Sequence, residues 1–424
     1  MKFEVVSVGM DGKSRTRTYD NITNEIFDRD ELVDLRSDPK YACLIRESEC
    51  EGDKSVYHKK SRTLRQIRIQ VGTHCNFHCK YCGQQASDKV IPIYKDSAKE
   101  VEEFLNKLEA NVSEVRSILF TGGEPLVYKK RLIPLAKGLR ELYPKVRLSM
   151  ITNGSLFDKA TAEWCLDNRI NLLISHDGPS FTAYRAEKDI LDDQNVIEGI
   201  RYYIDENKRS DLGLSLLFNV VVTPENSELD ALPAFFRNKI QRDVSLQFES
   251  IVKKNSDTEA QVTDFDDRSA STLINAIFKA GMNTDPSNPL RDFSRLAIKP
   301  ASRIVARKNL NDIQFSCDNA QADTVAVDLN GVILACQAYP ASKTGYGTLD
   351  ELDTACCSLP VSWHVRKDCL NCPVLVSCLG GCSIQSPSNH EITCRTLRLW
   401  HTGLFYIAWH RLFLEVIQSI EPLD

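Results

Sequence analysis

The chain has 424 residues, of which 42% are hydrophobic, and a formal net charge of −5 at pH 7. A chain of this length predicts two or three domains rather than one hydrophobic core. The slight negative charge disfavours nucleic acid or an anionic membrane surface as a partner. No apolar run approaches the roughly 18 residues of a membrane span, and the N-terminus does not resemble a secretory signal, so we expect a cytoplasmic location.

Residues 1–64 predict a small separate module. The segments "KFEVVSV" (2–8) and "RTRTYD" (15–20) flank the turn sequence "GMDGKS", which is typical of a β-hairpin. Such a module could cover the rest of the protein as a lid. Alternatively, a free edge of the hairpin could bind a peptide as an added strand.

Residues 65–259 alternate between short apolar runs and amphipathic segments. Strands are expected at 66–73, 115–123, 146–154, 170–179, 212–223 and 244–252, and helices at 96–112, 130–143, 158–169, 195–207 and 227–240. Near-continuous apolar strands separated by helices indicate a buried parallel sheet with right-handed crossovers. Six such units fall short of the eight of a closed barrel. The predicted fold class is therefore α/β, with a partial (β/α)6 barrel of parallel strands.

The last third of the chain predicts two further regions. Residues 260–305 read as a helical bridge, with a helix over 269–282 followed by a break at "TDPSNP". Residues 306–424 form a cysteine-rich domain that ends in an expected helix over 396–420, whose apolar residues recur at helical spacing. This domain contains nine of the 15 cysteines. Clustered thiols in a reducing compartment favour metal or cluster ligands over disulfides.

A dense group of thiols follows the first expected strand of the barrel. The sequence "CNFHCKYC" (75–82) places Cys75, Cys79 and Cys82 in one loop, at the strand end where barrels carry their chemistry. Three thiolates can bind a [4Fe–4S] cluster and leave one iron open. Structural zinc needs four ligands, so the alternative is a zinc site that His74 or His78 completes.

The loop "CNFHCKYC", together with "TGGEP" (121–125) after the second strand, resembles the radical S-adenosylmethionine superfamily. The resemblance implies that Cys75, Cys79 and Cys82 hold a [4Fe–4S] cluster whose open iron binds the amino and carboxylate groups of S-adenosylmethionine. Reductive cleavage of that cofactor would yield a 5′-deoxyadenosyl radical that abstracts hydrogen from a substrate. The implied cofactor contacts are Tyr81 by the adenine, Gly122, Gly123 and Glu124 at the methionine ammonium, and Asn153, Ser175, Asp177 and Arg185 at the ribose or carboxylate.

Two weaker signals accompany these motifs. The alternative reading of "SHDGP" (175–179) is a plain turn. Gln247 and Glu249, at the end of the sixth strand, could line the same mouth or form a satisfied polar pair in the barrel interior. No residue stands out as the catalytic acid or base.

The C-terminal cysteines resemble a SPASM domain, which carries two auxiliary [4Fe–4S] clusters and would bring the total to three. The pattern is Cys317-x13-Gly331-x4-Cys336, then Cys369-x2-Cys372-x5-Cys378-x3-Cys382, then Cys394. The resemblance implies a distal cluster on Cys369, Cys372, Cys378 and Cys394, and a proximal cluster on Cys317, Cys336 and Cys382. The fourth proximal ligand could be Cys356, Cys357 or a substrate, or the position could stay open. Paired zinc knuckles are the alternative, since Cys-x2-Cys suits zinc equally well.

This architecture implies an enzyme that abstracts hydrogen from a peptide, in our interpretation a ribosomally made precursor that becomes cross-linked or oxidised. It also implies an electron donor such as flavodoxin or ferredoxin. One alternative is the same chemistry on a sugar or alcohol. A sulfatase-maturase-like activity is disfavoured because Gln337 stands where that branch has an aspartate, and an amide cannot accept a proton at neutral pH. The non-enzymatic alternative is a zinc-stabilised binding protein.

Overall fold

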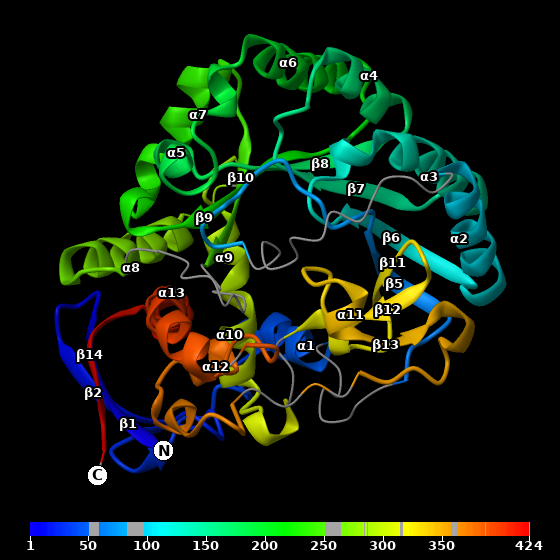
Figure 1. The fold of residues 1–424 in the computed structure, drawn as a ribbon. Helices are drawn as coiled ribbons and strands as arrows, with labels where there is room; N and C mark the ends of the chain where they lie inside the picture. Colours follow the sequence, from blue (N-terminus) through cyan, green and yellow to red (C-terminus); the bar gives the residue numbers. More distant parts are fainter. Residues whose placement is uncertain are drawn as a thin grey trace.

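The computed structural model describes residues 1–50, 59–82, 97–250, 264–283, 285, 287–313, 317–357, 359, 363–385 and 387–423. Residues 260–263, at the start of the expected helical bridge, lie outside these ranges. The described strands form a nine-stranded sheet of order β10-β9-β8-β7-β6-β5-β11-β12-β13 and a five-stranded sheet of order β14-β1-β2-β3-β4. The fold is therefore mixed α/β, with a parallel sheet at its centre, as the sequence predicted (Figure 1).

The six expected parallel strands pair in their expected order. They are β5 (Thr63–Gln70), β6 (Glu114–Thr121), β7 (Arg147–Thr152), β8 (Ile170–Ser175), β9 (Leu216–Val222) and β10 (Ser245–Ser250). The helices between them are α2 (Ser97–Asn111), α3 (Lys129–Leu142), α4 (Lys159–Asp167), α5 (Phe181–Tyr184), α6 (Gln194–Arg209) and α7 (Leu232–Ile240). In Figure 1 these helices form an arc around the outer face of the sheet.

Alternation along the strands separates an apolar outer face from a polar inner face. In β5, Ile67 and Ile69 are fully buried and join the main core with Phe104 of α2. Because successive side chains of a strand point to opposite faces, Arg68 and Gln70 lie on the inner side. The inner wall of the partial barrel is therefore polar at the end of its first strand.

Three strands from the cysteine-rich region extend the parallel sheet beyond its first strand. β11 (Thr324–Asp328) pairs in parallel with β5, and β12 (Val332–Leu334) and β13 (Gly345–Thr348) continue from it in antiparallel order. The sequence analysis did not identify these strands. β12 and β13 have only three and four residues, too few for a periodic pattern to be read.

The described helices outside the barrel arc cover the rest of the molecule. They are α1 (Ala42–Cys50), α8 (Asp267–Met282), α9 (Asp292–Leu296), α10 (Ile298–Val305), α11 (Ala341–Thr344), α12 (Leu375–Cys378) and α13 (Pro387–Phe413). α8 confirms the helix expected in the bridge. None of the helices in the described ranges combines the length and the apolar character needed to cross a membrane.

The second sheet joins the two ends of the chain. The expected hairpin is present as β1 (Lys2–Gly9) and β2 (Ser14–Asp20), followed by β3 (Ile26–Asp28) and β4 (Glu31–Leu32). β14 (Glu415–Pro422) pairs antiparallel with β1. The expectation of a free hairpin edge is therefore wrong for β1, whose outer edge is occupied by the C-terminal strand.

The expectation of one helix over 396–420 is also wrong beyond residue 413. α13 ends at Phe413, and Leu414 adopts a left-handed backbone with φ 57° that stops the helix. After this residue Glu415 and Ile417 are buried while Val416 is exposed, which is the period of a strand. The helical spacing that seemed to continue through these residues was too short to exclude a strand.

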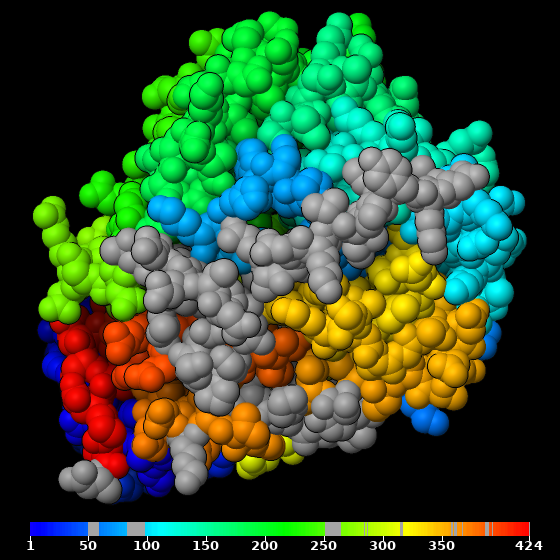
Figure 2. Space-filling view, viewed as in Figure 1, coloured from blue at the N-terminus to red at the C-terminus, as the bar shows by residue number. Residues whose placement is uncertain are grey.

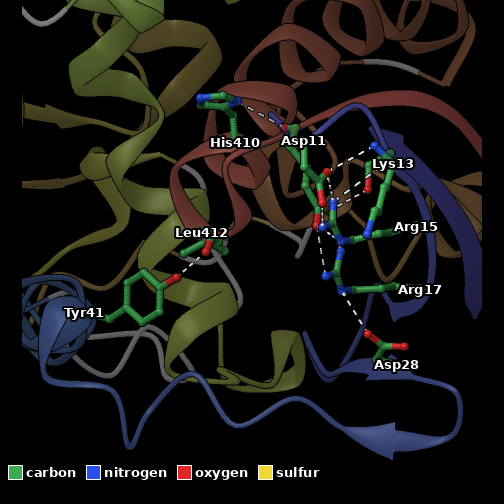
Figure 3. A network of polar contacts seen from close by, with 10 residues as sticks. Asp11, Lys13, Arg15, Arg17, Asp28, Tyr41, His410 and Leu412 are labelled. Atoms are coloured by element: carbon green, nitrogen blue, oxygen red, sulfur yellow. Dashed lines mark hydrogen bonds and ion pairs between the residues drawn. The ribbon is translucent and has the colours of Figure 1, made fainter. Parts of the chain in front are cut away.

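A buried ion pair holds β14 to the hairpin. Glu415 accepts hydrogen bonds from Ser7 at 2.6 Å and from both terminal nitrogens of Arg17, and its side chain is only 4% exposed. The Arg17 guanidinium also lies over the Phe413 ring at 4.4 Å. Figure 3 shows Arg17 and Asp28 together with Arg15 and Asp11 in this network, and a separate contact from Tyr41 to the Leu412 carbonyl. The two ends of the chain thus share one polar core.

Replacing Glu415→Gln should destabilise the fold by about 3–5 kcal/mol, because buried Arg17 loses its close counter-charge and is left with half-exposed Asp28 at 3.9 Å. Burial raises the pKa of Glu415, but hydrogen bonds from Arg17 and Ser7 and the charge of Arg17 lower it overall. The charge contribution is therefore present above the usual glutamate pKa and is lost as the pH falls through the lowered value. Urea unfolding at a series of pH values measures this. Glu421→Gln, on an exposed position of the same strand, should change little.

Candidate functional site

The cysteine loop begins where β5 ends. The turn that follows β6 binds the first residues of this loop through backbone hydrogen bonds. Gly123 donates a backbone hydrogen bond to the Gly72 carbonyl at 2.9 Å, and Glu124 donates one to the His74 carbonyl at 3.0 Å. A Cβ on Gly123 would lie 2.1 Å from the His74 oxygen, and Gly122 has a φ of 135° and a similarly close neighbour in Gly72. Only glycine permits this approach, so the "GG" of "TGGEP" has a structural cause.

Glu124 connects this turn to the end of β7. It is fully buried and accepts hydrogen bonds from the Leu126 amide, the Thr152 hydroxyl and the Asn153 amide. Burial raises the pKa of Glu124, and these three hydrogen bonds oppose the shift. The Asn153 side chain in turn donates to Asn76 at 2.8 Å and lies 3.8 Å from the Cys75 sulfur. The structure thus brings Glu124, Asn153 and Cys75 into one cluster.

Two of the three thiols of the loop, Cys75 and Cys79, favour the neutral form in the protein alone. Burial raises the pKa of Cys75 to about 11 and that of Cys79 to about 12. Cys82 raises the pKa of both, and Cys75 adds to the shift of Cys79. In the space-filling view the mid-blue part of the chain that includes this loop is exposed between the green and the yellow parts (Figure 2). The loop is accessible from the face that carries the strand ends.

Asp177 connects the cysteine loop to the strands behind it. Its carboxylate, which is fully buried, accepts hydrogen bonds from the Tyr81 hydroxyl, from Arg185 at 2.8 Å and from the Val221 amide at 2.9 Å. The Arg185 guanidinium also lies 5.3 Å from the Tyr81 ring centre. Tyr81, Asp177 and Arg185, which the resemblance assigned separately to the cofactor, therefore contact one another. Both carboxylate oxygens of Asp177 are thus engaged within the chain, whereas the buried Nε of Arg185 has no hydrogen-bond partner among the described residues.

Two residues that the sequence analysis missed support Asp177. Asn226 donates to the Asp177 carbonyl at 3.0 Å, and the Tyr184 ring stacks on Tyr81 with centres 6.2 Å apart. Asn226 lies 49 positions from Asp177, so no local pattern could reveal it. Tyr184 directly precedes Arg185, so the motif that contains Arg185 could have pointed to it.

The polar inner wall at the end of β5 is lined by carboxamide side chains. Gln70 donates to the carbonyls of Gln337 and Tyr339 at 2.8 and 3.0 Å. The Gln337 side-chain oxygen accepts from Asn319 at 2.9 Å and from Arg68 at 3.4 Å. Two donors thus occupy the atom that would have to take a proton, which agrees with the expectation that Gln337 is no base.

Residues on the opposite wall line up across the strands. The register places Ser175 of β8 beside Asn219 of β9, and Asn219 beside Gln247 of β10, with Glu249 one step further along. Asn219 is 5% exposed, and its side-chain oxygen has no hydrogen-bond partner in the described part of the chain. Ser175 and Gln247, both candidates from the sequence, therefore share one row with an amide that the sequence analysis did not single out.

The C-terminal thiols fall into two groups according to which charges they share. The pKa of Cys369 is raised to about 11 by burial and then by Cys394 and Cys372, and that of Cys378 is raised by burial and then by Cys372, Cys394 and Cys369. The pKa of Cys317 is raised to about 11 by burial, with Cys336 and Cys382 adding to the shift. The seven thiols thus separate into a group of four and a group of three.

Among the described residues, no three His, Cys, Asp or Glu side chains converge as ligands of a single metal ion. A cubane cluster binds its thiolates through four separate irons, so the relevant observation for such a group is which thiols are neighbours. The three thiols of the loop and the two C-terminal groups meet that condition, and their donor chemistry is that of iron–sulfur ligands.

A parallel α/β sheet with a three-thiol loop at its carboxyl edge defines an enzyme of the class that places its chemistry at strand ends. Residues 69–231 match the family model of the radical SAM superfamily. Residues 69–231 therefore carry a radical SAM domain.

Known proteins resemble this chain over different lengths. GTP 3′,8-cyclase of Sulfurimonas denitrificans is 31% identical over 164 residues, which cover 38% of this chain and 47% of that protein. The chain thus spans about half the length of these curated relatives. Radical SAM cyclopropyl synthase TigE of Paramaledivibacter caminithermalis is 21% identical over 406 residues, or 87% of this chain and 80% of that protein. The structure of anSMEcpe with bound AdoMet has a TM-score of 0.56 at 18% identity and covers 82% of this chain and 97% of that one, which shows a shared fold.

Tyr81→Phe should loosen the cysteine loop, because one buried oxygen of Asp177 loses its donor at a cost of about 1–3 kcal/mol. We expect less iron to be retained after anaerobic reconstitution and weaker binding of S-adenosylmethionine. Iron analysis and equilibrium dialysis measure both. Tyr184→Phe is the matched control, since its hydroxyl bonds Glu225 rather than Asp177. Wild-type iron content and affinity in Tyr81→Phe would show that the contact does not position the loop.

Proposed function

We propose that this protein is a radical S-adenosylmethionine enzyme that modifies a peptide, in particular a ribosomally made precursor, by abstracting hydrogen from it. The observation that carries the proposal is the placement of three neighbouring thiols at the end of β5, directly against the glycine turn after β6. The residues present fit a [4Fe–4S] cluster with one open iron, because the loop supplies three thiols for four irons.

In this proposal Cys75, Cys79 and Cys82 hold the cluster, and the turn of Gly122, Gly123 and Glu124 borders the cofactor. When reduced by a donor such as flavodoxin or ferredoxin, the bound cluster would supply the electron that cleaves S-adenosylmethionine to a 5′-deoxyadenosyl radical. The carboxylate oxygens of Glu124 and Asp177 are occupied by hydrogen bonds within the chain. Glu124 therefore orients Asn153 near the cofactor. Asp177 orients Tyr81 and Arg185 in the same way. Ser175 is 9% exposed on the inner wall and is the side chain we assign to a direct contact.

Two auxiliary clusters complete the proposal. The group of four thiols consists of Cys369, Cys372, Cys378 and Cys394, and the group of three consists of Cys317, Cys336 and Cys382. These are the two ligand sets that the resemblance to a SPASM domain implies. The agreement between sequence order and spatial grouping supports two clusters in the C-terminal domain.

The inner wall favours a peptide as the substrate. Carboxamides such as Asn219 and Gln247 offer a donor and an acceptor at fixed spacing, which is what a peptide group needs. The unpartnered oxygen of Asn219 can accept a hydrogen bond from a peptide N–H, which would remove the cost of about 1–3 kcal/mol of an unpaired buried acceptor. One solved structure of anSMEcpe contains AdoMet and the Cp18Cys peptide, and its TM-score to this chain is 0.53. The GTP 3′,8-cyclase of Sulfurimonas denitrificans matches over only 38% of this chain and does not carry the substrate assignment.

Cys79→Ala should abolish formation of 5′-deoxyadenosine, whereas Cys378→Ala should retain it and lose most peptide turnover. The first variant removes a ligand of the radical-generating cluster, and the second removes a ligand of the distal group, 299 positions further along the chain. Chromatography of the quenched reaction measures 5′-deoxyadenosine, and iron analysis reports which cluster was lost. Full cofactor cleavage by Cys79→Ala would contradict the site assignment.

A peptide co-expressed with the enzyme under anaerobic conditions should lose two hydrogens if it is cross-linked or oxidised. The candidate peptide is a short reading frame beside the gene of the enzyme. High-resolution mass spectrometry detects the change, with the Cys79→Ala enzyme as the control. An unmodified peptide, combined with consumption of a small sugar or alcohol by the same enzyme, would replace the peptide assignment.

A further inference from the structure

Lys60 is buried beside the thiol group of Cys317. Its side chain is 2% exposed, and its ammonium donates to the backbone carbonyls of Asn319, Gln321 and Thr324 at 2.6, 2.6 and 2.8 Å. These carbonyls belong to the turn that directly follows Cys317 and to the first residue of β11. All three donors of the ammonium are therefore used on neutral oxygens around one cysteine.

The other side of Lys60 faces the turn that contains Cys356 and Cys357. The Lys60 amide donates to the Ala355 carbonyl at 3.0 Å, and Lys59 forms an antiparallel bridge with Cys356. Lys60 thus lies between the Cys317 turn and the Cys356–Cys357 turn. The first turn follows Cys317, which belongs to the proximal thiols. The second turn contains Cys356 and Cys357, either of which could be the fourth proximal ligand.

An unused hydrogen-bond donor lies on β13. The Tyr346 hydroxyl is buried and has no hydrogen-bond partner in the described part of the chain. Tyr346 lies on β13 directly after Gly345, which pairs with Leu334 of β12, two residues before Cys336.

The charge of Lys60 is not balanced by the chain itself. No carboxylate of the described residues lies within ion-pair distance of its ammonium. A buried cation with only neutral partners is costly, and buried charges in proteins are normally paired. Burial lowers the pKa of Lys60 to about 8, while Cys357, Cys317, Asp323 and Cys356 act in the opposite direction. An anionic group bound to the neighbouring thiols would supply the missing counter-charge and an acceptor for Tyr346.

We propose that Lys60 and Tyr346 form a cationic, hydrogen-bond-donating wall for the iron–sulfur cluster at Cys317, Cys336 and Cys382, and that they set its reduction potential. The inference rests on the auxiliary cluster of the proposed function. A thiolate-ligated cluster gains one negative charge when it accepts an electron, so a nearby ammonium stabilises the reduced form more than the oxidised form. Net charge and hydrogen bonds to sulfur are the protein's main controls over such potentials.

Lys60→Met in the full-length, anaerobically reconstituted enzyme tests this. Methionine has a similar length without the charge, so the ratio of reduced to oxidised proximal cluster should fall about tenfold at a fixed potential, which equals about 59 mV for one electron. Tyr346→Phe should shift the potential in the same direction by a smaller amount. Redox titration followed by electron paramagnetic resonance measures both, and Cys336→Ala identifies the proximal signal by its loss.

Lys59→Met is the matched control, because its side chain is exposed beside Lys60, and it should leave the potential unchanged. An unchanged proximal potential in iron-replete Lys60→Met would overturn the inference and leave the proposed function standing. If Lys60→Met yields no folded protein, Tyr346→Phe decides, and a wild-type potential there overturns the inference. If Cys336→Ala removes neither iron nor a signal from the wild-type pattern, the auxiliary cluster itself is absent, and the proposed function fails instead.

Discussion

The close contact between two glycines and the start of the cysteine loop is the constraint on which the site depends. Gly122 and Gly123 bring the backbone after β6 against Gly72 and His74, where a single Cβ would overlap a carbonyl oxygen. This contact fixes the point at which the loop leaves β5. The Tyr81–Asp177 hydrogen bond fixes the other end of the loop against β8 and β9. A loop held at both ends by buried groups presents its thiols without reorganisation, which is what a preorganised cluster site requires.

The barrel could be predicted from the sequence because each of its strands is long and nearly continuous in apolar residues. β11 to β14 could not, for two physical reasons. β12 and β13 are too short to show a period, and their pairing is decided by β11 and β5, which lie far away in the sequence. In β14, the segment "EVIQSI" continues the apolar spacing of α13, and only Leu414 in a left-handed conformation separates the two. Pairing of β14 with β1, together with the ion pair between Glu415 and Arg17 of β2, overrides the local helical preference.

The candidate site shows a different division between sequence and structure. Motif spacing located the thiols, the glycines and the polar strand ends, because chain order and strand direction alone bring them to one edge. It could not tell which polar side chains face a ligand and which are satisfied within the protein. Glu124 and Asp177 are fully buried and saturated with internal hydrogen bonds, whereas Asn219, absent from the motifs, has an unpartnered oxygen. Whether a polar side chain faces a ligand or is satisfied within the protein depends on contacts between residues tens of positions apart. Such contacts cannot be recognised in a single sequence.

The buried charges of this protein differ in how they are compensated, and the difference follows function. Glu415 pairs with Arg17 and Asp177 pairs with Arg185, so both carboxylates have a partner within the chain and hold strands together. The thiols of Cys75 and Cys79 have pKa values near 11 and 12 because burial disfavours their anions. They must lose protons when iron binds, so cluster assembly supplies the positive charge that stabilises them and becomes more favourable as the pH rises toward those values. Lys60 is the opposite case, a buried cation among thiols. It lacks a negative partner until those thiols bind an anionic group. Charges that the chain pairs by itself serve the fold, and charges that it leaves unpaired mark the places built for a bound group.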